Sequence, residues 1–177
     1  IVRCGGRPIE LLRTAVESVE KQTYGKFHLI LAKYQELDVE PILNQQYKNI
    51  TSISVLESMG GIRSTTLWAG IKAARGDCFS VLDDDDVYFS DHFERLFQPF
   101  PAERPVKFFA YSGSISGYGE PKSIQGGGAD RREIFRFGIT GASDLMQISD
   151  AFASNSFVAS MDLVEQSLQS DPLMHTN

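Results

Sequence analysis

Two spacings of apolar residues alternate along the first half of this 177-residue chain. Short unbroken apolar runs are typical of buried strands, whereas apolar residues that recur every third or fourth position are typical of helices. Strands are predicted at residues 1–6, 26–32, 50–57 and 78–82, and helices at 7–25, 39–47 and 62–77. This alternation predicts an α/β domain in which a mostly parallel sheet lies between two layers of helices.

The first of these helices carries the clearest pattern. Its apolar residues, among them Ile9, Leu12 and Val16, follow the three- and four-residue spacing of an amphipathic helix. Pro8 stands near the first turn, where a proline is tolerated because no backbone donor is needed there. Gly25 closes this stretch, as expected where a helix stops.

Four consecutive aspartates, Asp83 to Asp86, follow the fourth predicted strand directly. Two carboxylates about 5 Å apart repel by roughly 3 kcal/mol at an effective dielectric near 20, so such a cluster needs solvent or a cation. If the strand continues into the run, Asp83 and Asp85 point to one side, and Asp84 and Asp86 to the other. A carboxylate pair at the carboxyl end of a parallel strand suits Mg²⁺ or Mn²⁺ together with a substrate phosphate.

A simpler interpretation of the run is a solvated turn that leads into a helix cap. Asp91, with Glu94 three residues later, predicts a capping box for a helix at 92–97. The run does not fit an EF-hand, because it lacks the spaced aspartates, the glycine and the closing glutamate of that loop.

The second half of the chain is less regular. A further strand is predicted at 106–112, and the Gly- and Ser-rich stretch after it predicts a long loop or irregular hairpin. The remaining predictions are a loop at 113–130, a strand within 132–141, and helices at 142–148 and 161–168.

Composition narrows the functional classes. One domain is the simplest division of a chain of this length, although its abrupt ends suggest a fragment of a longer protein. A net charge of −6 argues against a general nucleic-acid binder. Cys4 and Cys78, the two cysteines, are expected to be free thiols. No apolar run approaches the roughly 18 residues of a membrane span, so the expected location is the cytoplasm, with any membrane attachment made through parts outside this chain.

Residues 1–97 resemble family 2 glycosyltransferases of the GT-A fold, a Rossmann-like three-layer α/β/α sandwich. The resemblance rests on a proline-led helix ending in S-V-x-x-Q-T-Y, a second helix ending in A-x-G-D, and an L-D-x-D-D motif after a strand. The matching residues are Ser18, Val19, Gln22, Thr23 and Tyr24, then Ala74, Gly76 and Asp77, then Leu82, Asp83, Asp85 and Asp86.

The resemblance implies a nucleotide-sugar donor, most simply a UDP-sugar, whose diphosphate is held by Mg²⁺ or Mn²⁺ on the D-x-D motif. Asp85 would then be the direct metal ligand, and Asp83 would contact the ribose or the metal's waters. Asp84 occupies the variable position of the motif and is the weaker donor-site candidate. Transfer would go with inversion to a hydroxyl of a glycan, lipid or protein acceptor.

Several positions depart from the family pattern. Lys33 and Tyr34 stand where the family usually has an acidic motif that grips the base, and Tyr34 could stack on a base or simply lie at the solvent edge. Arg63 could replace a missing arginine of the next helix or be a surface charge. Around Cys4 and Gly5, backbone groups would have to meet the nucleotide without the usual side chains.

The catalytic base is the largest gap. In the family it commonly lies in a Glu-Asp pair, and this chain contains no Glu-Asp dipeptide. Asp144 and Asp150 are weak candidates, with helix caps and surface charges as their alternative roles, and the base could also lie beyond Asn177.

Two other functions remain open at this stage. The first is a domain of the same fold that binds a nucleotide or a protein partner without turnover, which the altered motifs favour. The second is a nucleotidyltransferase, although that class usually carries a Gly-rich loop with a basic residue after the first strand, and CGGRP is only a faint match.

Overall fold

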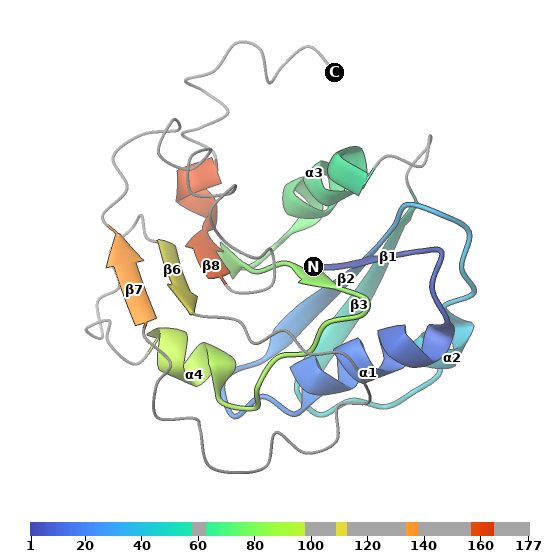
Figure 1. The fold of residues 1–177 in the computed structure, drawn as a ribbon, viewed down its shortest axis with the longest axis horizontal. Helices are drawn as coiled ribbons and strands as arrows, with labels where there is room; N and C mark the ends of the chain where they lie inside the picture. Colours follow the sequence, from blue (N-terminus) through green and yellow to red (C-terminus); the bar gives the residue numbers. More distant parts are fainter. Residues whose placement is uncertain (58–62, 98–108, 113–133, 138–156, 165–177) are drawn as a thin grey trace.

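The computed structural model describes residues 1–57, 63–97, 109–112, 134–137 and 157–164 (Figure 1). The strands and helices predicted for the first half are confirmed, most with shorter ends, except for the strand predicted at 78–82. The helices are α1 (Ile9–Glu20), α2 (Glu40–Leu43), α3 (Arg63–Ala73) and α4 (His92–Phe97). The strands are β1 (Val2–Cys4), β2 (Phe27–Lys33), β3 (Ile50–Glu57), β4 (Cys78–Phe79), β5 (Leu82–Asp83), β6 (Phe109–Ser112), β7 (Ile134–Phe137) and β8 (Phe157–Ser160).

The first sheet is parallel and has the strand order β3-β2-β1-β5. From β1 the chain passes through α1 to β2 and then through α2 to β3 on one side, whereas β5 pairs with β1 on the other. The strand order therefore reverses direction at β1, and open α/β sheets bind their ligands beside the carboxyl ends at such a point.

Helices cover both faces of this sheet. Figure 1 shows α1 and α2 on one side and α3 on the other. Because side chains alternate along a strand, Leu29 and Leu31 of β2 pack in one buried cluster with Leu12 of α1, whereas Ala32 faces α3 at Gly70. The predicted three-layer α/β/α arrangement is confirmed.

The segment predicted as one strand at 78–82 is in fact two. β4 pairs antiparallel with β8 in a second sheet of order β4-β8-β6-β7, and β5 joins the parallel sheet. Strand β8 was not predicted at all. The helix predicted at 161–168 is present at residues 161–164, and its remaining residues lie outside the described part. So do the predicted loop at 113–130 and the predicted helix at 142–148.

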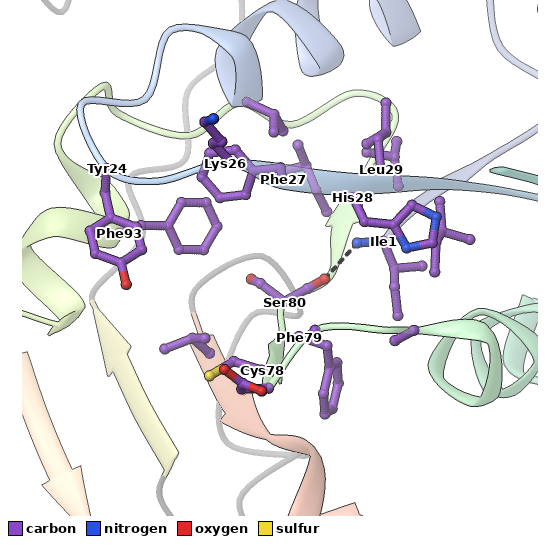
Figure 2. Close-up of a pocket in the computed structure, with 18 of the residues that line it drawn as sticks. Ile1, Tyr24, Lys26, Phe27, His28, Leu29, Cys78, Phe79, Ser80 and Phe93 are labelled. Carbon is purple, nitrogen blue, oxygen red and sulfur yellow. Dashed lines mark hydrogen bonds between the residues drawn. The ribbon is translucent and has the colours of Figure 1, made fainter. Parts of the chain in front are cut away.

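A cavity of about 290 Å³ lies between the two sheets. Figure 2 shows the residues that surround it, which include Ile1, Phe27, Phe79 and Ser80. Because Ile1 precedes β1 and Phe27 begins β2, this cavity lies at the amino ends of the parallel strands, away from the aspartate run. In the part of the chain that the structure describes, no helix has the length and apolar character to cross a membrane.

Candidate functional site

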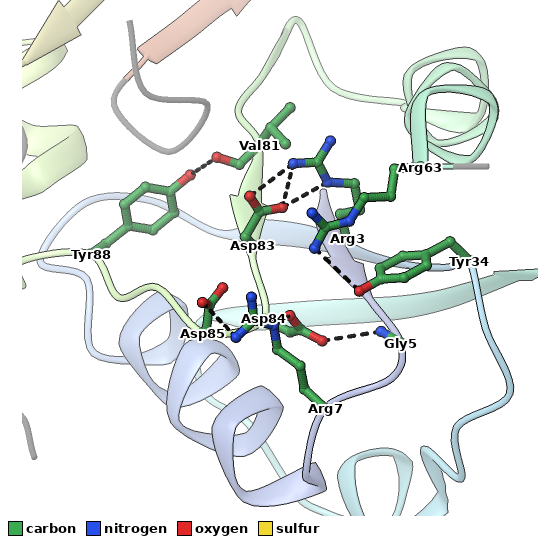
Figure 3. Close-up of polar contacts among 10 residues, drawn as sticks. All are labelled: Arg3, Gly5, Arg7, Tyr34, Arg63, Val81, Asp83, Asp84, Asp85 and Tyr88. Atoms are coloured by element: carbon green, nitrogen blue, oxygen red, sulfur yellow. Dashed lines mark hydrogen bonds and ion pairs between the residues drawn. The ribbon is translucent and has the colours of Figure 1, made fainter. Parts of the chain in front are cut away.

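The candidate site lies where β1 and β5 end side by side. A tight turn after β1 brings the chain back over the aspartates. Gly5 has φ +145° and Gly6 φ +73°, both in the region that favours glycine. A Cβ on Gly5 would also come within 2.8 Å of the backbone nitrogen of Gln35. This turn places Arg7 beside the acidic run (Figure 3).

Asp83 is paired with Arg3. The two residues are register partners on β5 and β1, and the Arg3 Nε and Nη2 donate to Oδ1 and Oδ2 of Asp83 at 2.7 and 2.8 Å. Both side chains are less than one-fifth exposed. A bidentate pair of this kind holds the carboxylate in one orientation and offsets its charge.

Asp84 is the most buried of the three carboxylates, with 1% of its surface exposed. Its Oδ2 accepts a hydrogen bond of 3.0 Å from the Gly5 backbone N–H. Its Oδ1 has no hydrogen-bond partner among the described residues, although the Arg7 Nε lies 3.4 Å away. Burial raises the pKa of this carboxyl above its usual value, while the Gly5 hydrogen bond and Arg7 act in the opposite direction.

The alternation predicted for the aspartates does not hold. It assumed that the strand continues through the run, but β5 ends at Asp83 and residues 84–85 form a turn. Asp84, the variable position of the motif, is therefore buried against the β1 turn instead of pointing away from the site.

Asp85 lies closest to solvent and is paired with Arg7. The Arg7 Nη1 is 2.8 Å from Asp85 Oδ2, and the two side chains are 40% and 34% exposed. One guanidinium thus spans the buried Asp84 and the accessible Asp85. Of the three carboxylates, Asp85 is the one that a ligand from solvent reaches most readily.

Tyr34 and Arg63 lie next to each other at the border of the site. The Arg63 guanidinium lies 4.9 Å from the centre of the Tyr34 ring, and its Nη2 donates to the Tyr34 hydroxyl at 3.2 Å. Tyr34 is 8% exposed, so the open solvent-edge position considered from the sequence is wrong. The structure brings these two donor-site candidates together, and Arg63 has a specific partner.

Beyond the ends of β2 and β3 lies a hollow of about 750 Å³, lined by residues that include Lys33, Leu37, Val39 and Glu57. The Lys33 Nζ is 2.8 Å from the Glu57 carboxylate. Lys33, where the family resemblance implies the base-binding end of the donor site, lines this hollow.

Cys4 contributes structure at this edge of the sheet. Its side chain is fully buried in the core, and burial raises the pKa of the thiol to about 12, so the thiol stays protonated at neutral pH. The Cys4 carbonyl accepts from the Tyr34 backbone N–H at 3.0 Å. The Gly5 N–H is bonded to Asp84, so the Cys4 carbonyl and the Gly5 N–H, two of the backbone groups expected to lie near a nucleotide, already have protein partners.

The sequence interpretation missed Arg3 and Arg7. Two features of the sequence could have indicated these arginines. Arg3 lies on a strand that ends beside the acidic run, and Arg7 directly follows a pair of glycines. The charge of Arg3 and Arg7 alone does not reveal their part in the site, because their positions beside the aspartates depend on the pairing of β1 with β5. Asp144 and Asp150, the candidate bases, lie outside the described residues.

The residues present offer a divalent cation few protein ligands, so tight binding of the cation requires a substrate to complete its coordination. Within the described ranges, no group of three or more His, Cys, Asp or Glu could hold a metal by itself. Mg²⁺ is typically held by one or two carboxylates and by substrate phosphates. Asp85, the accessible carboxylate of the run, is the residue that could serve as such a ligand.

A model of the family described as Glycosyl transferase family 2 matches residues 6–162. The match begins at Gly6, directly after β1, and includes the aspartate run and the strands β2 to β8. No curated protein sequence matches the chain.

Proposed function

Since this chain belongs to glycosyl transferase family 2, we propose that it transfers a sugar from a nucleotide-diphosphate donor to an acceptor hydroxyl with inversion, assisted by Mg²⁺ or Mn²⁺. The observation that carries the proposal is the convergence of Asp83, Asp84 and Asp85 on the point where the parallel sheet reverses its strand order. The donor is a nucleotide sugar, most simply a UDP-sugar, and the acceptor a glycan, lipid or protein.

Each carboxylate has a separate role in this proposal. Asp85 is the metal ligand because it is the most accessible. Asp83, held by Arg3, faces the ribose or the waters of the metal. Asp84 fixes the β1 turn through Gly5 and so shapes the wall against which the donor lies. The cation, when bound, stabilises the negative charge that develops on the departing nucleoside diphosphate.

The nucleoside would extend from Asp83 toward Tyr34 and the hollow beyond β2 and β3. Lys33 takes the position that is usually acidic in the family, so it can donate to base oxygens where the family motif accepts. Arg63 can swing from the Tyr34 hydroxyl to a donor phosphate, for which a guanidinium is well suited. A carboxylate takes the proton from the acceptor hydroxyl, and Asp144 and Asp150 remain the candidates in this chain.

The proposal is tested by thermal unfolding with Mn²⁺, with UDP and with both. If the cation bridges protein and diphosphate, only the combination should raise Tm, by at least about 5 °C at a hundredfold excess over Kd. Asp85→Ala should abolish the rise, whereas Asp162→Ala, which removes an exposed carboxylate after β8, should leave it intact.

Two results would contradict the proposal. The first is the absence of a shift with UDP, GDP and dTDP in the presence of metal, and the second is a shift that survives Asp85→Ala. Binding of UDP-sugar without release of UDP in the presence of candidate acceptors would instead favour a domain that binds its nucleotide without turnover.

A further inference from the structure

We propose that Arg7 is a built-in counter-cation of the donor site: it occupies the position of the metal at Asp85 until metal and donor bind, and then pairs with the donor diphosphate. This inference rests on the proposed function, because it assigns a further positioning residue to the same site. It concerns Arg7, which the sequence offered only as the basic residue of CGGRP and not as part of the donor site.

The first support is the position of the Arg7 guanidinium. Its Nη1 lies 2.8 Å from Asp85 Oδ2 and its Nε lies 3.4 Å from Asp84 Oδ1, so a single positive group faces both carboxylates (Figure 3). Among the described residues, Arg7 is the cation that pairs directly with Asp84 and Asp85, so without it these two carboxylates would repel each other with no cation in contact with them. Arg7 therefore supplies, in the metal-free protein, the charge that a divalent cation would supply.

Arg7 and a metal cannot both use the same side of Asp85. Mg²⁺ binds carboxylate oxygens at about 2.0–2.1 Å and demands near-ideal octahedral geometry. A guanidinium nitrogen 2.8 Å from Asp85 Oδ2 stands in the space of that cation or its waters. Like charges would also repel at this separation, so binding of the metal requires Arg7 to withdraw from Asp85.

Arg7 differs from Arg3 in being able to move. Its side chain is 40% exposed, whereas that of Arg3 is 15% exposed and bound to Asp83 by two hydrogen bonds. The backbone before it is held, since Gly5 donates to Asp84. The Arg7 side chain can thus swing while its backbone stays at the mouth of the site.

A diphosphate offers Arg7 its next partner. A donor diphosphate that bridges to the metal on Asp85 must lie within reach of a side chain that already contacts Asp85. Guanidinium groups bind phosphate oxygens in paired, charge-assisted hydrogen bonds. Removing Arg7 should consequently have two opposite effects: metal alone binds more tightly, and nucleotide in the presence of metal binds more weakly.

The test measures Mn²⁺ binding by electron paramagnetic resonance without nucleotide, and UDP binding by calorimetry at saturating Mn²⁺. For Arg7→Ala we expect Mn²⁺ alone to bind at least fivefold more tightly than to wild type, and UDP at least fivefold more weakly. Arg13→Ala on α1, which removes an arginine near Tyr47, is the matched control and should change neither affinity. If Arg7→Ala does not fold by circular dichroism, Arg7→Gln replaces it with the same expectations.

The outcomes separate this inference from the proposed function. If Asp85→Ala binds Mn²⁺ as wild type does, the metal site itself is wrong and the proposed function fails. If Asp85→Ala loses Mn²⁺ but Arg7→Ala binds it no more tightly than wild type, the inference about Arg7 alone is overturned. Tighter Mn²⁺ binding without weaker UDP binding would overturn the second half, the transfer of Arg7 to the diphosphate.

Discussion

Gly5 shows how one residue fixes the geometry of the site. It combines a φ of +145° with a space in which any Cβ would lie 2.8 Å from the Gln35 backbone nitrogen. We expect Gly5→Ala to lower the free energy of unfolding by roughly 2–4 kcal/mol, because backbone strain and a clash with main chain add together. Urea denaturation measures the change.

Gly25→Ala is the matched control for this prediction. Gly25 also has positive φ, at +76°, but a Cβ there meets nothing within 4 Å. Gly25→Ala should lower the free energy of unfolding only by the strain of the left-handed region, roughly 1–2 kcal/mol. A Gly5→Ala cost no larger than that of Gly25→Ala would show that the chain after β1 shifts easily, contrary to the fixed backbone that we assign to it.

At the level of single residues, the sequence predicts the acidic half of the site better than the basic half. Asp83 and Asp85 are recognisable because they directly follow an apolar run. Arg3 and Arg7 gain their meaning only from the pairing of β1 with β5, between residues some 80 positions apart. Long-range pairing of this kind leaves no local periodicity, so a single sequence cannot reveal it.

At the level of helices and strands, the main difference between the prediction and the structure is the break between β4 and β5. The apolar run at 78–82 has the composition of one strand, and nothing local says that its two ends belong to different sheets. Ser80 and Val81 form the junction, and the buried Tyr88 secures it: the Tyr88 hydroxyl donates to the Val81 carbonyl at 2.8 Å and lies 2.7 Å from Ser80 Oγ. Strand β8 escaped prediction for a related reason, because its partners β4 and β6 are distant in sequence.

Tyr88→Phe should therefore weaken the junction without changing the core volume much. The Val81 carbonyl loses a buried donor, so we expect the free energy of unfolding to fall by about 1–2 kcal/mol in urea denaturation. Tyr47→Phe is the comparison, since the Tyr47 hydroxyl also donates to a backbone carbonyl, of Ile42, but lies nearer to solvent, where water can replace it. Equal losses in the two variants would contradict a special role for Tyr88.

At the scale of the whole molecule, the S-V-x-x-Q-T-Y motif at the end of α1 holds the chain that follows the candidate site. Ser18 Oγ accepts from the Tyr88 backbone N–H at 3.1 Å, and the buried Gln22 donates to the Phe89 carbonyl at 2.6 Å. Gln22 Oε1 also accepts from the Phe93 N–H at 3.3 Å. The S-V-x-x-Q-T-Y motif therefore holds the segment that follows the aspartate run, so the two motifs are structurally connected.

This connection predicts that a substitution of Gln22, at the end of α1, affects ligand binding at the candidate site. Gln22→Ala should lower the free energy of unfolding by roughly 1–3 kcal/mol, because buried backbone groups of Phe89 and Phe93 lose their partner. It should also speed hydrogen exchange at the Phe93 amide and reduce the Tm rise with Mn²⁺ and UDP, since the chain beyond Asp86 is less firmly held. Gln45→Ala, at an exposed position after α2, should change none of these. If Gln22→Ala lost stability but kept both the exchange protection of Phe93 and the full Tm rise, α1 would stabilise the domain without supporting the site.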